Sequence, residues 1–481
     1  MYKRQALDYN EGMNKDMNNL RKTVRPKAHA SPRENAMYRS FGSLYSRGKY
    51  HIFFEHFPFG LYSSHRFIGH AESDDLIFWK SKPIAIYSTK TNDFDGAYEG
   101  SCLEDESGMV LYYMGINYTT RDMDDVNSYV HNTPIKTNLM ACHSFDTTSS
   151  EFDNVKKKET LFSDSNFVEM GFESGSIKDP EAYKIDDSTR FITFLAKDIK
   201  SKKQALGFIK AIKEKDDSYS YQYVGKQLLE KEDEEIRTIK FFKSEDNYLV
   251  TLESNFPKIK MEREQLPEFK VFVGRGTIDF EKCKFKIEVN SLIPLDYGFD
   301  VRAPKVAYDT RNLPYIMCST KMTHDIKGSM GMITLPRRVT CSSDGSIETY
   351  IHPIITQRMI YKSNDEKIRQ THFPLLITAN LRDSSSIAVG GLGIYRTDGI
   401  LHVDRRNISD LPKEGHVRIN VAKIPVKDQV TSLRIFLDQD IVEIEINEKQ
   451  MISFITLSDD TTIKQSGIEN YETYTLNQTK I

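Results

Sequence analysis

The chain consists largely of short runs of β-branched and aromatic residues, which Gly, Asn, Asp and Ser interrupt at close intervals. Apolar residues at the 3.6-residue spacing of an amphipathic helix are rare, and the runs do not alternate with helical segments. Parallel α/β folds need that alternation, so they are excluded. The pattern predicts an all-β architecture: a propeller, a barrel or a sandwich. Representative predicted strands are Tyr50–His56, Val110–Met114, Phe191–Leu195, Tyr248–Leu252 and Tyr315–Cys318.

A length of 481 residues exceeds what one ordinary hydrophobic core organises, so we expect two domains. Composition changes near residues 345–365, and apolar runs then follow at about 8- to 12-residue intervals, which is typical of a β-sandwich. We expect a polar lead-in over 1–24, a first domain over 25–345, a linker over 346–357 and a sandwich over 358–481. The predicted sandwich strands are Pro374–Leu381, Ile387–Arg396, Gly399–Arg406, Val417–Ile424, Leu433–Leu437, Ile441–Asn447 and Met451–Ser458.

Charge and composition exclude several classes of partner. Lys plus Arg number 66 against 69 Asp plus Glu, a balance that predicts no nucleic-acid or membrane binding. The first residues lack the apolar core of a secretory signal, and the five scattered cysteines form no C-x-x-C pair. We therefore expect a cytoplasmic protein with reduced thiols, no metal site and no cofactor. The sequence leaves the oligomeric state open.

The segment His29–Gly42, HASPRENAMYRSFG, carries the most specific motif of the chain. It resembles the opening signature of glycoside hydrolase family 32, the β-fructofuranosidases, which reads close to H-x-S-P-x-x-x-W-M-N-D-P-N-G. The family's nucleophilic Asp falls on Arg39, and no Asp occurs anywhere between residues 17 and 73. The positions in register are His29, Ser31, Pro32, Met37 and Gly42.

Further blocks follow in the family's order over about residues 25 to 460, and they imply a five-bladed β-propeller followed by a β-sandwich. Asp179, in IKDP, takes the place of the transition-state-stabilising Asp, and Glu253, in LESN, that of the general acid/base. The remaining blocks are YHIFFEHFPFG, IGHAESDDLIFW, YEGSCL (F-S-G-S-A-V in the family), DYGFDVRAPK (D-Y-G-x-D-F-Y-A-P-Q), GSMGMITLPR and, in the sandwich, LRIFLDQDIVEIEIN. The resemblance implies substrate-binding positions at Arg39, Glu55, Ile68, Ser101, Lys178 and Arg302.

The replaced nucleophile bears directly on the chemistry. A retaining glycosidase needs one carboxylate to attack the anomeric carbon and a second, protonated one about 5 to 5.5 Å away. Arg39 cannot attack, because a guanidinium stays protonated and offers no free lone pair. The family's sugar-contacting positions are those replaced, whereas its structural Gly, Pro and Trp79 positions remain. We therefore expect the ordinary retaining mechanism of a β-fructofuranosidase or sucrose-6-phosphate hydrolase to be disabled.

Three interpretations remain open at this point. The chain is a non-catalytic binder of a sugar or sugar phosphate, an enzyme in which Asp179 activates water and Glu253 acts as acid, or an interaction module with an abandoned pocket. Arg39, Lys178, Arg302 and Lys305 make an anion site a further hypothesis, because arginine suits phosphate recognition. The alternative for Arg39 is a salt bridge to Asp179 or Glu253, and for Glu55 a hydrogen bond at the pocket floor or a pair with Arg39.

Overall fold

The structure is a computed structural model, and it is nearly all β-strand. The expected lead-in over 1–24 lies outside the described residues. The structure describes residues 26–32, 35–58, 65–89, 91–105, 108–120, 135–144, 156–257, 269–321, 331–361, 374–408, 420–456, 462–469 and 471–476.

Residues 36 to 351 form five antiparallel sheets, each with its strands in sequence order. The first two are β1 (Ala36–Ser46), β2 (Lys49–Phe57), β3 (Phe67–Ser73) and β4 (Lys80–Ile86), then β5 (Gly96–Asp105), β6 (Gly108–Tyr118), β7 (Ile135–Ser144) and β8 (Lys156–Phe162). The third is β9 (Lys178–Lys184), β10 (Thr189–Lys197), β11 (Gln204–Lys213) and β12 (Tyr219–Leu228). The fourth is β13 (Ile236–Ser244), β14 (Asn247–Ser254), β15 (Lys270–Asp279) and β16 (Lys284–Ile287), with β17 (Ile293–Pro294) on β15. The fifth is β18 (Val301–Tyr308), β19 (Pro314–Thr320), β20 (Arg337–Cys341) and β21 (Ile347–Ile351).

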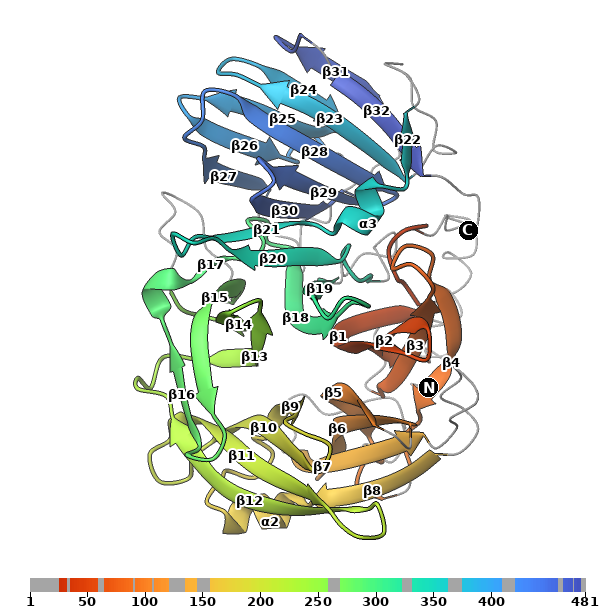
Figure 1. Ribbon diagram of the computed structural model, residues 1–481, viewed down its shortest axis with the longest axis vertical. Coiled ribbons are helices and arrows are strands. Elements are labelled where there is room, and N and C mark those ends of the chain that lie inside the picture. Colours follow the sequence, from red (N-terminus) through yellow and green to blue (C-terminus); the bar gives the residue numbers. More distant parts are fainter. Residues whose placement is uncertain are drawn as a thin grey trace, which may run out of the picture.

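The first strand of each sheet faces a common centre. β1 contacts β5, β5 contacts β9, β9 contacts β13, β13 contacts β18, and β18 returns to β1. This closed ring makes the five sheets the blades of a β-propeller (Figure 1). Because each first strand runs from the same end of the ring, the opening residues of β1, β5, β9 and β18 lie close together.

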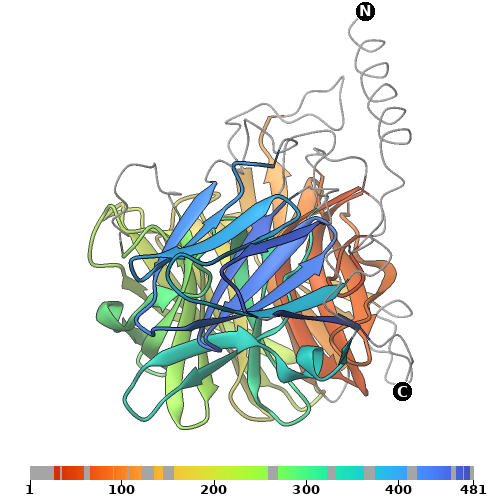
Figure 2. The same ribbon diagram turned by 90° about the horizontal axis from the view of Figure 1, so that it is seen from above.

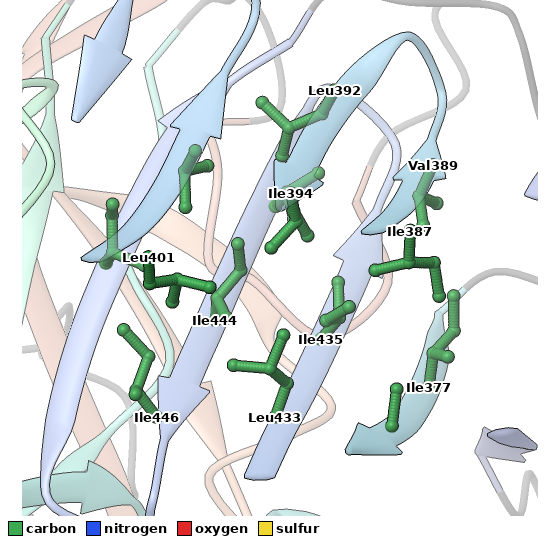
Figure 3. Close-up of a cluster of buried hydrophobic side chains, with 14 of the residues drawn as sticks. Ile377, Ile387, Val389, Leu392, Ile394, Leu401, Leu433, Ile435, Ile444 and Ile446 are labelled. Atoms are coloured by element: carbon green, nitrogen blue, oxygen red, sulfur yellow. The ribbon is translucent and has the colours of Figure 1, made fainter. Parts of the chain in front are cut away.

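The remaining strands form the predicted sandwich, which packs beside the fifth blade (Figures 1 and 2). One sheet has the order β22-β32-β23-β28-β29-β30 and the other β27-β26-β25-β24-β31. Apolar side chains from both sheets fill the space between them, among them Ile377, Ile394, Ile435 and Ile444 (Figure 3). The strands are β22 (Met359–Tyr361), β23 (Leu375–Leu381), β24 (Ser386–Val389), β25 (Leu392–Thr397), β26 (Ile400–Asp404), β27 (Val421–Pro425), β28 (Thr431–Asp438), β29 (Ile441–Ile446), β30 (Gln450–Ile455), β31 (Ile463–Ser466) and β32 (Tyr471–Leu476).

Two expectations need correction. The single strand predicted over Ile387–Arg396 is a hairpin, because Gly390 and Gly391 both have positive φ (58° and 80°) and turn the chain between β24 and β25. The expected linker over 346–357 contains β21, which pairs with β20, and the short helix α3 (Pro353–Thr356). The other helices among the described residues are also short: α2 (Asp164–Glu169), capped by Ser163, and the 3-10 turn η1 (Val289–Ser291). No helix in the described part of the chain is long and apolar enough to cross a membrane.

A buried charged network joins the two domains. Arg337, at the start of β20, contacts Asp296 at 2.8 Å and Glu443 of β29 at 2.8 Å, and all three side chains are fully buried. Its Nη2 also donates to Ser453 Oγ at 2.7 Å, and that hydroxyl in turn donates to Asp296. The domains therefore meet through charged groups whose partners come from both sides.

His29, the first residue of the motif, lies in this junction and not among the residues expected to contact sugar. Its Nδ1 contacts Asp438 at 2.8 Å and its Nε2 contacts Glu443 at 3.0 Å. Both ring nitrogens can donate to carboxylates only in the protonated ring. Burial opposes protonation, but the two carboxylates outweigh it and raise the pKa of His29 to about 9.

The protonated His29 between Asp438 and Glu443 predicts that the protein loses stability in mild alkali. The folded pKa of His29 exceeds the unfolded value of about 6.5, so its contribution is full below pH 6.5 and disappears as the pH rises through about 9. We expect the free energy of unfolding to fall by on the order of 3 kcal/mol across this window. Urea unfolding between pH 6 and 9.5 measures the fall. A His29→Gln variant serves as control, and an equal slope in that variant would assign the effect to other groups.

Candidate functional site

Arg39, which the resemblance places at the position of the nucleophile, forms a buried ion pair with Glu253. It lies in β1 at a register irregularity between Met37 and Ser40, a distortion that reorients side chains. Its Nη2 donates to Glu253 Oε2 at 2.9 Å, and its Nε lies 3.6 Å from Glu99 Oε1. Sequence analysis offered ligand binding or a salt bridge to Asp179 or Glu253 as the role of Arg39. The structure contains the salt bridge to Glu253.

The same contacts fix the charge of Glu253. Burial by itself raises the pKa of this carboxyl, but Arg39 and the Ala303 N–H, which donates to Oε2 at 2.9 Å, outweigh burial and lower the pKa below its usual value. Glu253 is therefore ionised at neutral pH and has no proton for a leaving group. The role of general acid, implied by the resemblance, is not supported by this state.

Asp179 is the second residue of β9 and is held from several directions. Its Oδ1 accepts from Lys305 Nζ at 2.9 Å, its Oδ2 accepts from the Ile239 N–H at 2.9 Å, and its own N–H donates to Glu99 Oε2 at 3.0 Å. Burial raises its pKa to about 7 despite Lys305, and Glu181 and Glu99 add to the rise. Its backbone has a positive φ of 49°, so the residue is held in a strained conformation.

The basic residues of the anion hypothesis differ in their partners. Lys305 contacts Asp179 and Glu181 and donates to the Gly100 carbonyl, and Lys178 pairs with Glu235 at 2.7 Å. Arg39 is neutralised by Glu253, as described above. Arg302, in β18, has no ion pair within 4 Å among the described residues, and its Nε and Nη2 are buried without a hydrogen-bond partner. The hypothesis therefore depends on Arg302.

Glu55 pairs with a residue that the sequence did not single out. Its Oε2 accepts from Arg66 Nη1 at 2.9 Å, and its Oε1 accepts from the Glu99 N–H at 2.9 Å. The guanidinium of Arg66 stacks on the rings of Tyr38 and Tyr98, each 4.2 Å from the ring centroid. Glu55 is fully buried, and the cation that it pairs with is Arg66 and not Arg39.

Two other expected sugar contacts belong to the packing between and within blades. Ile68 is fully buried in an apolar cluster with Phe41 and Phe53. Ser101 Oγ accepts from the Ala182 N–H at 2.9 Å, which ties β5 to β9. The structure thus brings Arg39, Glu253, Asp179 and Glu55 together around Glu99, while Ile68 and Ser101 lie in the packing beneath.

Glu99 is the residue whose importance sequence reasoning missed. It contacts Arg39 and the Asp179 N–H through its side chain, and Glu55 through its own N–H. The available signal was the YEGSCL block, where Glu99 stands at a serine of the family pattern F-S-G-S-A-V. A new carboxylate beside a new arginine is the signature of charge compensation. Among the described residues, no group of three His, Cys, Asp or Glu could hold a metal ion.

Comparisons with known proteins agree with this architecture. Residues 29–353 match the glycosyl hydrolases family 32 N-terminal domain. The sucrose-6-phosphate hydrolase of Escherichia coli is 34% identical over 93 residues, 19% of this chain and 20% of the relative. The raffinose invertase of Escherichia coli is 33% identical over 90 residues, 19% of each chain. The matched segment thus spans about a fifth of the length of these curated relatives.

The likeness to solved structures extends over the whole chain. Sucrose-6-phosphate hydrolase from Lactobacillus gasseri superposes with a TM-score of 0.76 at 17% identity, covering 97% of this chain and 96% of that one. The Bombyx mori GH32 β-fructofuranosidase superposes with a TM-score of 0.70 at 17% identity, covering 99% of both chains. These superpositions establish a common fold, and the family match covers more than half of the sequence. The chain belongs to glycosyl hydrolase family 32.

Proposed function

We propose that this protein binds a β-fructoside or a fructoside phosphate in the propeller site, and that the ordinary retaining hydrolysis of its family is disabled. The relatives named above act on sucrose 6-phosphate or raffinose by their names, which supports a fructoside ligand here. A cytoplasmic location belongs to the same proposal. It is supported by the cysteine pattern, because the five cysteines are scattered and form no C-x-x-C pair, as expected of a reducing compartment.

The ion pair between Arg39 and Glu253 is the observation that carries this proposal. Retaining hydrolysis needs an attacking carboxylate and a protonated acid. Arg39 supplies no attacking lone pair, and its contact at 2.9 Å keeps Glu253 ionised. One substitution therefore removes the nucleophile and also deprives the acid of its proton.

The second candidate is an inverting hydrolase, and the charge states favour a particular assignment of roles. Glu253 is ionised and suits a base that activates water, whereas Asp179, with a pKa of about 7, can carry the proton for the leaving oxygen. This reverses the roles expected from sequence. The contact from Lys305 to Asp179 opposes it, because the lysine favours the ionised carboxyl.

Fructose release tests the proposal. The purified protein is incubated with sucrose, sucrose 6-phosphate, inulin and levan, beside the Escherichia coli sucrose-6-phosphate hydrolase as active reference. We expect fructose release to be at least about a thousandfold slower than for the reference, because the attacking carboxylate and the protonated acid are both missing. Calorimetric titration of the same sugars measures binding independently, and we expect binding without turnover.

The Glu253→Gln variant is the control for this assay. Turnover that this variant abolishes would show a working site without an Asp nucleophile, and it would overturn the proposal in favour of the inverting candidate. Absence of both turnover and sugar binding, in a protein that melts cooperatively, would instead favour a role through its surfaces.

A further inference from the structure

Tyr38 stands directly before Arg39 and reaches solvent where its neighbours in β1 do not. Of residues 36 to 44, it alone is not buried. Arg66, which stacks on its ring, and Glu99 have side chains that are 20% and 22% exposed, whereas the Arg39 side chain is 7% exposed. A ligand that enters this site from solvent therefore meets Tyr38 before it meets the buried charges.

Three neighbours fix the orientation of the Tyr38 ring. The Cζ atoms of Arg302 and Arg66 lie over the ring, 4.0 Å and 4.2 Å from its centroid. The ring of Phe57 packs against it edge to face, with the two centroids 5.9 Å apart. Guanidinium groups favour aromatic rings in this stacked arrangement. The direction of the Tyr38 hydroxyl is therefore set by its surroundings.

The hydroxyl of Tyr38 is left available by the fold. In the part of the chain that the structure describes, it makes no hydrogen bond, and its oxygen is not closed off from solvent. Two tyrosines of the second blade differ in this respect. Tyr98 Oη lies 3.1 Å from Tyr118 Oη, and Tyr113 Oη donates to Asp93 at 2.8 Å. The Tyr38 oxygen is thus free to meet a ligand.

Positive charge around this phenol favours its ionised form. Burial by itself raises the pKa of Tyr38, but Arg302, Arg66 and Arg39 outweigh burial and the opposing charge of Glu55, and they lower the pKa below its usual value. A larger fraction of Tyr38 is therefore phenolate at neutral pH than for an ordinary tyrosine. A phenolate is an oxygen nucleophile, and tyrosine forms covalent intermediates in enzymes, among them one class of glycosidases.

We infer that Tyr38 is the nucleophile that remains in this site, and that its Oη accepts a fructosyl group from a β-fructoside whose leaving group departs without a proton. The fructosyl part of this inference rests on the proposed function, whereas the reactivity of the phenol does not. The restriction on the leaving group follows from Glu253, which Arg39 keeps ionised and which has no proton to give. The leaving group of sucrose needs that proton, so slow release from sucrose agrees with a reactive Tyr38.

The reaction has two steps. In the first, the ionised Oη of Tyr38 attacks the anomeric carbon C2, the bond from C2 to the leaving oxygen breaks, and its electron pair departs with the leaving group. In the second, a water oxygen attacks C2, Glu253 takes the proton of that water, and the bond from C2 to Oη breaks and restores the phenolate. An ionised Glu253 cannot assist the first step, but it suits the second.

The aryl glycoside 4-nitrophenyl β-D-fructofuranoside tests the inference, because its leaving group departs as an anion at neutral pH. Stopped-flow absorbance follows the nitrophenolate, and mass spectrometry of the quenched and digested protein locates the fructosyl adduct. We expect a burst of about one equivalent of nitrophenolate per chain and a fructosyl group on Tyr38, followed by slower release. Calorimetric titration with sucrose measures ligand binding separately.

Four variants assign the burst to its groups. Y38F is expected to lose the burst and the adduct, because it lacks only the attacking oxygen. The control is Y248F, at an exposed tyrosine of β14, which is expected to keep both. R302Q keeps the phenol but loses the cation with the largest effect on its pKa, so the burst is expected to slow by about tenfold for each unit by which the pKa rises. E253Q is expected to keep the burst and to slow the release that follows it.

Thermal melting of each variant separates a folding defect from lost reactivity. If Y38F fails to fold, R302Q is compared with R311Q, at an exposed arginine on the β18–β19 hairpin. A slower burst in R302Q alone would support the inference, and equal bursts in these two variants would overturn it.

A wild-type protein that binds sucrose but gives neither burst nor adduct would overturn the role of Tyr38 and leave the proposed function standing. A burst that folded Y38F retains, or an adduct on Tyr248 in place of Tyr38, would mean non-specific reaction and would overturn the inference as well. Absence of burst, adduct and sucrose binding together would overturn both the inference and the proposed function.

Discussion

Replacing Arg337 with methionine is expected to lower the free energy of unfolding by about 3 to 5 kcal/mol, because removing one member of a buried ion pair leaves the others without compensation. Arg337 is fully buried and contacts both Asp296 and Glu443. Without it, these two carboxylates and Asp438 would face the single positive charge of His29. Arg337 and His29 also lower the pKa of Glu443 to about 2, and the variant is expected to raise it.

Urea unfolding followed by two independent signals measures this loss, since two domains need not unfold together. Arg275→Met is the matched control: its ion pair to Glu288 lies on the surface of the fourth blade, where both side chains are about 40% exposed, and we expect a loss below about 1 kcal/mol. A loss in Arg337→Met as small as in this control would show that the domain junction does not depend on the buried network.

Replacing Arg39 with glutamine is expected to reverse the way in which Glu253 responds to pH. In the wild type the folded pKa of Glu253 is lowered, so its contribution is present above the unfolded value of about 4.5 and disappears as the pH falls through the folded pKa. In the variant the largest of the groups that lower this pKa is lost, and only the Ala303 N–H, Arg237 and Arg302 remain to oppose burial, so the pKa rises. Ionised Glu253 then destabilises the fold by about 3 kcal/mol near neutrality, and the penalty disappears toward acid pH.

The measured quantity is the difference in unfolding free energy between wild type and Arg39→Gln, followed from pH 4 to pH 8. We expect this difference to shrink as the pH falls. The double variant Arg39→Gln with Glu253→Gln completes the cycle, and its difference from Glu253→Gln alone is expected to be small and independent of pH. A pH-independent loss in the single variant would mean that Arg39 acts through packing and not through the charge of Glu253.

The strands were largely predictable because their signals are local. β2, β6, β10, β14 and β19 contain the predicted runs of β-branched and aromatic residues. β21, with the sequence IETYI, was missed because a short, partly polar outer strand differs little from a linker in composition. The hairpin between β24 and β25 was missed because a glycine pair can lie within a strand or turn the chain, and the pairing of the flanking segments decides which.

The candidate site was predictable in its residues and much less in its contacts. The motif order identified Arg39, Asp179, Glu253, Glu55 and Arg302, and the absence of an Asp near the first block followed from the sequence. The motif order could not show which cations are neutralised, because the carboxylates that pair with them lie far away in the chain. Arg39 and Glu253 are 214 residues apart, and Lys305 and Asp179 are 126 apart.

The sequence by itself determined the all-β class and the expectation of two domains, since both depend on residue type and order along the chain. Its resemblance to the family implied a propeller followed by a sandwich, with an arginine at the position of the nucleophile. The tertiary structure alone decided the state of the charges. Closing the ring of blades brings together the ends of β1, β9, β14 and β18 and excludes water there, and this pairs Arg39 with Glu253 and leaves the edge of Arg302 unpaired. Whether a buried charge is compensated depends on neighbours within a few ångströms, and the order of residues does not specify them.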